Sequence, residues 1–292
     1  MPEKQTVIGR FAPSPTGPLH LGSLYTALAS FLQARSQQGR WLLRIDDLDT
    51  PRNRPGSVAS ILDTLDKLGL HWDGGIAYQS RQLACYQDKL DYLLQNHWLY
   101  RCGCSRKMPG SENYSGHCRN HHVSPGIPHA LRLKTDTWQV IFDDLLQGLV
   151  TEQLSGPHSD FIVKRKDHVI AYQFAVVVDD HLQQVNEIVR GCDLLTSTPK
   201  QIYLQQLLGY PTPRYVHVPV IIDRYGFKLS KQTLATAVDT HNPSALIFNL
   251  LDLLKQQPPK ALTGASVTEL LNWAVAHWHP EALKNTQTLS IS

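Results

Sequence analysis

The chain has 292 residues, of which 42% are hydrophobic, and a formal net charge of +3 at pH 7. This length allows one large domain or two smaller ones with an ample core, and the mild positive charge permits RNA binding without demonstrating it. No apolar run is long enough to cross a bilayer and none follows the start as in a secretory signal, so we expect a cytoplasmic protein with no membrane partner.

The chain opens with a predicted strand, loop and helix. Residues 7–11 are apolar enough for a buried parallel strand, and a Pro/Ser/Thr/Gly-rich loop follows. Apolar residues at helical spacing begin at Leu19. A helix N-terminus offers N–H groups to phosphate, His20 adds a hydrogen-bond donor, and Gly22 has no side chain to exclude a nucleotide. The segment predicts a phosphate site, with a simple helix cap carrying a surface histidine as the alternative.

Strands and helices alternate through most of the remaining chain. Before residue 100 we expect a strand at 41–46 and helices at 58–68 and 83–99. After residue 157 we expect strands at 161–164 and 185–190, and helices at 172–179 and 199–208. This order predicts an α/β fold whose two halves are residues 1–99 and 158–240.

Residues 100–157 interrupt this alternation and are expected to form an insertion with short strands at 130–134 and 138–142. Cys102, Cys104 and Cys118 lie within one short window of it, and a cytoplasmic setting disfavours disulfides. Three clustered thiols with little apolar material around them favour a structural zinc, with three free surface cysteines as the alternative. The candidates for a fourth ligand are Tyr114, His117, His121 and His122, among which chemistry alone favours a histidine.

A second short motif follows a predicted strand at 216–222 and a turn at 223–227. Lys228 and Lys231 stand three residues apart with Ser230 between them. A lysine-bearing loop suits a reaction whose transition state gains charge on phosphate, although a solvated basic loop explains the motif taken alone. Helices at 244–254 and 267–278 then predict a small C-terminal module at 241–292.

Together these segments resemble the class I aminoacyl-tRNA synthetases. Residues 13–22 resemble the HIGH box of that family, and residues 228–232 resemble its KMSKS loop. Residues 10–17, 44–49 and 189–194 resemble blocks of glutamyl-tRNA synthetase. The resemblance implies a Rossmann-like catalytic domain with an inserted, zinc-bearing, acceptor-type subdomain and a small helical C-terminal module, which we expect to act as a monomer.

The resemblance also implies a role for each matching residue. Those expected to bind ATP, with Mg²⁺, are Pro13, Thr16, Gly17, His20, Gly22 and Lys231. Those expected to bind L-glutamate are Arg10, Phe11, Ala12, Pro13, Ser14, Asp46, Tyr172 and Arg190. Those expected to stabilise charge in catalysis are His20, Lys228 and Lys231.

Physical chemistry agrees with these roles and leaves two details open. Arginine grips a carboxylate in a planar fork, but the sequence does not tell which arginine meets which carboxylate of glutamate. Asp46 stands where the family usually has glutamate, so its contact with the substrate ammonium is expected to be longer or bridged by water.

The acceptor is inferred from the C-terminal part and from the cysteines. About sixty residues follow Lys231, too few for the anticodon-binding region of a full-length glutamyl enzyme. The pattern Cys102, Cys104, Tyr114, Cys118 is similar to that of a truncated branch of the family, which implies Tyr114 as the fourth zinc ligand. That branch implies transfer of glutamate to queuosine in the anticodon loop of tRNA(Asp). The alternatives are a catalytic fragment that charges a tRNA 3′ end, another nucleotidyltransferase with an H-x-G box, and a non-catalytic RNA-binding paralogue.

Overall fold

The computed structural model describes residues 5–104, 114–228 and 240–291. Its centre is a row of parallel strands, formed by β1 (Ile8–Phe11), β2 (Arg40–Ile45), β3 (Ala77–Tyr78), β9 (Glu187–Gly191) and β10 (Arg214–Val218). At the junction of the two halves, the Asn186 side chain accepts the Ile8 N–H at 2.8 Å, and the Asn186 N–H donates to the Ile8 carbonyl at 3.1 Å. β1 therefore lies beside β9, and the chain moves outward in opposite directions from this pair. Such a reversal is where open α/β sheets bind ligands.

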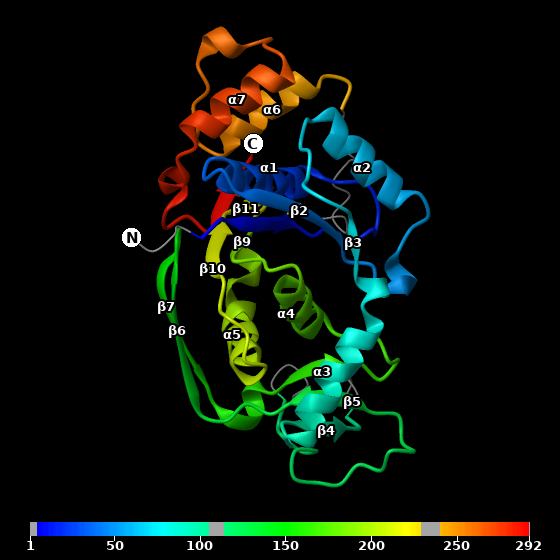
Figure 1. Ribbon diagram of the computed structural model, residues 1–292. Helices are drawn as coiled ribbons and strands as arrows, with labels where there is room; N and C mark the ends of the chain where they lie inside the picture. Colours follow the sequence, from blue (N-terminus) through cyan, green and yellow to red (C-terminus); the bar gives the residue numbers. More distant parts are fainter. Residues whose placement is uncertain (1–4, 105–113, 229–239, 292) are drawn as a thin grey trace.

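Helices cover both faces of these strands (Figure 1). One face carries α1 (Leu21–Arg35), α6 (Pro243–Leu253) and α7 (Val267–His277), and the other carries α4 (Tyr172–Leu182) and α5 (Thr198–Leu207). Helix α1 is apolar around most of its circumference because it lies between the strands and α6 and α7. Two hydrophobic cores result, one on each side of the strands. No helix among the described residues is long and apolar enough to span a membrane.

An antiparallel region lies beyond α3 (Leu83–Gln95), at the opposite end of the molecule from α7 (Figure 1). Strands β4 (Leu99–Cys102), β5 (Ala130–Leu133) and β8 (Phe161–Lys164) form a sheet in the order β4-β5-β8. The hairpin of β6 (Trp138–Asp144) and β7 (Gly148–Leu154) instead joins the central strands, because β6 pairs with β10. The sheet that carries the cysteines thus uses β8, which follows the insertion boundary expected at residue 157.

The predicted elements agree with the structure apart from two corrections and four strands that were not predicted. The helix expected at 83–99 ends at Gln95, where His97 takes a left-handed backbone (φ 60°) and Leu99 begins β4. The strand expected at 216–222 is two strands, because Pro219 has no N–H to continue the ladder. The second of these, β11 (Val220–Ile222), pairs with β12 (Thr288–Ser290). The strands that were not predicted are β3, β4, β7 and β12.

The remaining elements are short or peripheral. Helix α2 (Ser57–Lys67) buries one face under the first core, as its apolar spacing predicts. The 3₁₀ helices are η1 (Thr50–Arg52), η2 (Gln79–Arg81), η3 (Gly156–Ser159), η4 (Cys192–Ser197), η6 (Lys260–Leu262) and η7 (Pro280–Leu283).

Candidate active site

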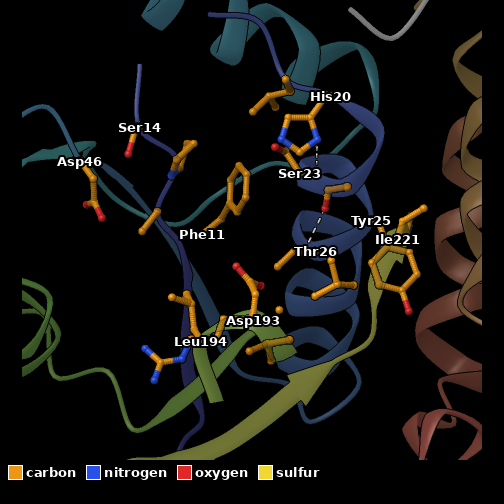
Figure 2. A pocket seen from close by; sticks show the side chains of 18 of the residues that line it. Phe11, Ser14, His20, Ser23, Tyr25, Thr26, Asp46, Asp193, Leu194 and Ile221 are labelled. Carbon is orange, nitrogen blue, oxygen red and sulfur yellow. Dashed lines mark hydrogen bonds between the residues drawn. The ribbon is translucent and has the colours of Figure 1, made fainter. Parts of the chain in front are cut away.

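A cavity of about 360 Å³ opens at the carboxyl ends of β1 and β9, where the connections of the sheet reverse. Figure 2 shows Ser14 and Asp46 on one side of it and Ser23, Thr26 and Tyr25 along α1 on the other. The predicted residues that line this pocket are Arg10, Phe11, Ala12, Pro13, Ser14, Thr16, His20, Gly22, Asp46, Tyr172, Arg190 and Lys228. Gly17 does not line it, and Lys231 lies outside the described residues. The fold thus gathers nearly all of the predicted ATP and glutamate residues into one cavity.

His20 caps the first helix at the pocket wall. Its Nδ1 accepts the backbone N–H of Ser23 at 3.3 Å, so a neutral ring carries its proton on Nε2. The ring therefore combines a donor with the positive end of the α1 dipole. The position of His20 at the helix N-terminus is the one that the sequence predicts.

Three arginines line the pocket, and the two predicted from the sequence, Arg10 and Arg190, differ in the use of their N–H groups. Both Arg10 and Arg190 are buried, with about 5% of each residue exposed. Arg10 donates Nε and Nη2 to Asp180 at 3.1 and 3.5 Å, and Nη1 to the Val189 carbonyl at 3.3 Å. Arg190 donates Nε to His217 at 3.1 Å, whereas its Nη1 is buried without a hydrogen-bond partner among the described residues. A buried unpaired donor is costly, and a bound anion would satisfy Nη1 of Arg190 or Nη2 of Arg44, which also lines the pocket and has no partner among the described residues.

Asp46 supplies the negative side of the pocket. Its Oδ1 accepts Nε of Arg44 at 2.7 Å, and its N–H donates to the Pro13 carbonyl at 3.0 Å, which ties it to the first motif. Burial raises the pKa of Asp46 to about 6, against the lowering effect of Arg44. Arg44 is shared with Asp180, whose Oδ1 accepts its Nη1 at 2.7 Å. A substrate ammonium beside Asp46 would add a second positive charge to that of Arg44 and favour the ionised carboxylate further.

Lys228 lies at the mouth of the pocket, just before the residues outside the described part of the chain. Its Nζ contacts Oδ2 of Asp193 at 2.6 Å, and both side chains are more than a third exposed. Such a pair is screened by water and salt, and contributes little to stability. Lys228 can therefore exchange Asp193 for a phosphate at little energetic cost.

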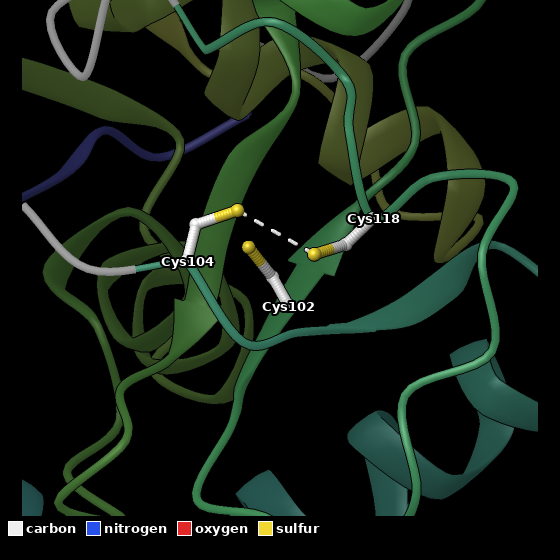
Figure 3. Close-up of side chains that lie close together, drawn as sticks. All are labelled: Cys102, Cys104 and Cys118. Atoms are coloured by element: carbon white, nitrogen blue, oxygen red, sulfur yellow. Dashed lines mark hydrogen bonds between the residues drawn. The ribbon is translucent and has the colours of Figure 1, made fainter. Parts of the chain in front are cut away.

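The three clustered cysteines lie together at the end of β4, as Figure 3 shows. The sulfurs of Cys102, Cys104 and Cys118 lie within 4.8 Å of one another, and those of Cys104 and Cys118 are 3.5 Å apart. Zinc bound tetrahedrally at about 2.3 Å from each sulfur would separate the sulfurs by about 3.8 Å. Although burial opposes it, a hydrogen bond from Arg132 lowers the pKa of Cys102 and so favours the thiolate that binds metals. The donor set fits zinc in both chemistry and spacing.

The structure distinguishes the candidates for a fourth ligand. Tyr114 is buried in the same cluster, and its hydroxyl accepts the Cys118 N–H at 2.9 Å. Burial and the neighbouring Cys102 raise the pKa of Tyr114 to about 12. His117, His121 and His122 are exposed, and no histidine of the described residues brings a ring nitrogen into the group of sulfurs. The histidine that chemistry alone favours is thus not at the cluster, whereas the tyrosine is beside it.

Sequence reasoning missed several buried polar residues, of which Arg44 lines the pocket and the others lie behind it. Arg44 and Asp180 link the two halves of the fold, while His217 and Asp144 lie behind Arg190. Each is a polar residue within or next to an apolar run, and a buried polar group must find a partner. That signal marks such residues as unusual but does not identify their partners.

Comparison with known proteins identifies the family and the fold of this chain. The family model of tRNA synthetases class I (E and Q), catalytic domain, matches residues 6–255. The glutamyl-Q tRNA(Asp) synthetase of Aromatoleum aromaticum is 47% identical over 279 residues, covering 93% of this chain and 88% of that protein. The protein of the same name from Methylococcus capsulatus is 48% identical over 273 residues, covering 92% of this chain and 90% of that protein. The fold is similar to a glutamate tRNA ligase from Elizabethkingia meningosepticum solved with its amino acid, with a TM-score of 0.80 at 23% identity, covering 99% of this chain and 67% of that one.

Proposed function

The chain belongs to the glutamyl-Q tRNA(Asp) synthetase family of class I tRNA synthetases and is a ligase, and from this premise we propose a two-step reaction. In the first step, ATP and L-glutamate form glutamyl-adenylate without any tRNA. In the second, the glutamyl group passes to queuosine in the anticodon loop of tRNA(Asp). The observation that carries this proposal is the pocket, which brings together the buried, unpaired Nη1 of Arg190, the carboxylate of Asp46 and the His20 cap of α1.

The amino-acid half of the pocket suits a dicarboxylate with one ammonium group. Arg190 offers the unpaired Nη1 to one carboxylate, and Asp46 accepts the ammonium. Arg10 is already held by Asp180, so it serves mainly to fix the pocket wall and its positive charge. The remaining glutamate contacts we propose are Phe11, Ala12, Pro13, Ser14 and Tyr172.

The nucleotide half favours in-line attack. An α-carboxylate oxygen of glutamate forms a bond to the α-phosphorus of ATP while the bond to pyrophosphate breaks. His20, the α1 N-terminus, Lys228 and Lys231 stabilise the charge that develops, and Pro13, Thr16, Gly17 and Gly22 position the nucleotide. Mg²⁺ bound with ATP neutralises phosphate charge. A hydroxyl of queuosine then attacks the activated carbonyl, and AMP leaves.

We propose that zinc organises the cysteine cluster, with Cys102, Cys104, Cys118 and Tyr114 as ligands. The burial of all three partners of Cys104 and the exposure of the histidines support this set. We propose the domain division 1–99, 100–157, 158–240 and 241–292, with the insertion 100–157 contacting the tRNA, and a monomeric protein.

The test separates the two steps. ATP–pyrophosphate exchange is measured with glutamate, glutamine and aspartate in the absence of tRNA, and glutamate is expected to support it far better than the other two. Labelled glutamate is then offered with tRNA(Asp) carrying or lacking queuosine, each with and without the 3′-terminal adenosine. Label is expected only on tRNA that carries queuosine, and its attachment should survive removal of the terminal adenosine.

Each of the other outcomes would favour a different function for this protein or contradict one of the two steps. Charging of unmodified tRNA(Glu) at its 3′ end would favour an ordinary synthetase fragment. Absence of exchange with every amino acid would favour a non-catalytic RNA-binding paralogue. Exchange that requires tRNA would contradict the first step as proposed.

A further inference from the structure

The buried residues behind Arg190 form a chain that the reaction above does not use. His217 is fully buried and pairs with Arg190 across the neighbouring strands β10 and β9. Its Nδ1 lies 2.6 Å from Oδ2 of Asp144, and its Nε2 accepts Nε–H of Arg190 at 3.1 Å. Nη2 of Arg190 donates to the Thr198 hydroxyl at 2.7 Å. Three strands from separate segments therefore meet at one pocket arginine.

The hydrogen bonds fix where the imidazole proton lies. Arginine can only donate, so Nε2 of His217 must present its lone pair to Arg190. The proton must then be on Nδ1, where an ionised Asp144 accepts it. Thr198 lies 3.1 Å from the same Nε2, and Tyr215 stacks on the ring at 5.9 Å. The neighbours of the ring are thus compatible with one neutral tautomer.

The charges around the ring favour the same state. Burial lowers the pKa of His217, and the charge of Arg190 lowers it further, whereas Asp144 and the more distant Asp193 oppose the shift. Although burial opposes it, hydrogen bonds from His217 and from backbone N–H groups lower the pKa of Asp144. Among these three side chains, Asp144 therefore carries a negative charge, the imidazole of His217 is neutral and Arg190 carries a positive charge.

We propose that Asp144 and His217 are positioning residues. Asp144 sets the tautomer of His217, and His217 holds Arg190 in the orientation in which its Nη1 meets a substrate carboxylate. Nε and Nη2 are each held by a fixed partner, and only Nη1 remains unpaired among the described residues. A pre-oriented, charged donor selects a carboxylate over a carboxamide, because the uncharged amide oxygen accepts a weaker hydrogen bond than a carboxylate oxygen does. This inference rests on the proposed activation of glutamate.

The surroundings of Asp144 make one variant especially informative. Its Oδ1 accepts the N–H groups of Leu146 at 3.1 Å, Gln147 at 2.9 Å and His217 at 3.2 Å. In Asp144→Asn, the amide oxygen keeps these bonds, which turns the NH₂ group toward Nδ1 of His217. Nδ1 must then accept, and the ring proton moves to Nε2, where it faces the N–H of Arg190. Two donors oppose each other, and Arg190 loses its fixed position.

The experiment combines nitrogen NMR of the histidine rings with ATP–pyrophosphate exchange. In the unaltered protein, His217 is expected as a neutral ring protonated on Nδ1 at pH 7 to 8. Asp144→Asn should move the proton to Nε2 and raise KM for glutamate by about 10- to 100-fold, with a smaller change in kcat and a reduced preference over glutamine. Asp73→Asn is the matched control, since Asp73 also accepts a backbone N–H and an arginine but lies outside the pocket.

A second pair of variants keeps the test decisive if Asp144→Asn does not fold. His217→Gln retains an acceptor near Nε2, whereas His217→Asn retains only a donor near Nδ1, so KM for glutamate should rise more in His217→Asn. Equal effects of the two, or a switched tautomer with unchanged KM, would overturn the proposal. A ring protonated on Nε2 in the unaltered protein would also overturn it. Absence of glutamate-dependent exchange in the unaltered protein would instead count against the proposed function, and the NMR result would stand separately.

Discussion

The active-site pocket and the cysteine cluster differ in the amount of apolar material that surrounds them. The pocket is built on strands between two extensive hydrophobic cores, and its charged residues pair with one another, as Arg44 does with Asp46 and Asp180. The cluster has a core of only four buried residues, Tyr100, Cys102, Tyr114 and Cys118. Two of those four are cysteines with sulfurs close to a third.

This difference indicates that different interactions stabilise the two regions. Burial of apolar side chains fixes the pocket before any ligand binds, at about 25 cal/mol for each Å² removed from water. The small core of the cluster gains little in this way, and its neighbouring thiols oppose ionisation, as shown by the pKa of Cys104, which burial and the adjacent cysteines raise to about 12. A bound divalent cation would coordinate the sulfurs and stabilise their thiolate forms. We therefore expect the two regions to respond separately to changes at either one.

The largest effect expected is loss of the metal. Cys118→Ser should weaken zinc binding by about 10³-fold or more, because one of four ligands is lost and metal binding is folding energy for this segment. Metal analysis of protein purified without chelators should fall from about one zinc per chain to almost none. Proteolysis should then cut within residues 100–135 before the central strands.

The same variant tests whether the regions are separate. Glutamate-dependent exchange should stay within about threefold of the unaltered protein, as expected for distant sites. Cys85→Ser is the matched control, because Cys85 is a free thiol on α3 outside the cluster. If exchange disappeared together with zinc, the pocket would depend on the cluster and the comparison would fail.

The next largest effect is expected at Arg190. Arg190→Ala should raise KM for glutamate by about 10²- to 10³-fold, since a charged, pre-oriented donor is lost. KM for ATP should change little, and zinc content should not change. Arg190→Lys keeps the charge but not the fork, so it should recover only a small part of the affinity. Exchange kinetics at varied glutamate measure both, and an equal loss in ATP affinity would mean that Arg190 supports the whole pocket.

The sequence predicted those parts of the site that adjoin each other in the chain. The helix cap at His20 and the strand before it are local features, and hydrophobic spacing is sufficient to locate them. The partners of Arg190 are not local. His217 lies 27 residues further along the chain, and Asp144 lies 73 residues before His217. Only the register of β6, β10 and β9 brings them together, and periodicity carries no information on register between distant strands.

The errors in the predicted fold have similar causes. Strand β7 exposes most of its residues, so it lacks the apolar alternation that marks a half-buried strand. Residues 216–222 were predicted as one strand because apolar residues flank Pro219 on both sides. The structure divides them because β11 pairs with β12, near the C-terminus, and β10 pairs with other strands. The fourth zinc ligand was open for a different reason, since ligand chemistry ranks histidine above tyrosine but does not place either one.

A smaller effect is expected at the lysine motif. Lys231→Ala should lower kcat for activation by about 10²-fold with little change in KM for glutamate, because the charge it meets develops mainly in the transition state. Lys231 lies outside the described residues, so this prediction rests on the motif alone. Exchange rates at saturating glutamate and ATP measure it. A rise in KM for glutamate like that of Arg190→Ala would contradict the division of roles within the pocket.

The smallest effect expected is the pH dependence of glutamate binding through Asp46. Burial raises its pKa from 3.8 to about 6, and only the ionised form attracts an ammonium group. KM for glutamate should therefore be constant above about pH 7 and rise about tenfold by pH 5. The same pKa shift also makes the free energy of unfolding depend on pH, but this contribution favours low pH, whereas glutamate binding favours high pH. The folded state holds this proton more tightly than the unfolded state, so the contribution is fully present below pH 3.8 and is lost as pH rises through about 6.

Two variants assign that dependence to Asp46. Asp46→Asn should weaken glutamate binding at pH 8 and remove the rise between pH 7 and 5, whereas Asp46→Glu should keep a rise because it keeps a carboxylate. A rise in KM that survived in Asp46→Asn would belong to another group. Exchange assays from pH 5 to 8 give KM, and zinc content measured on the same samples shows whether the cysteine cluster loses its metal in acid. A pH profile that followed zinc content would assign the effect to the cluster and contradict the role of Asp46.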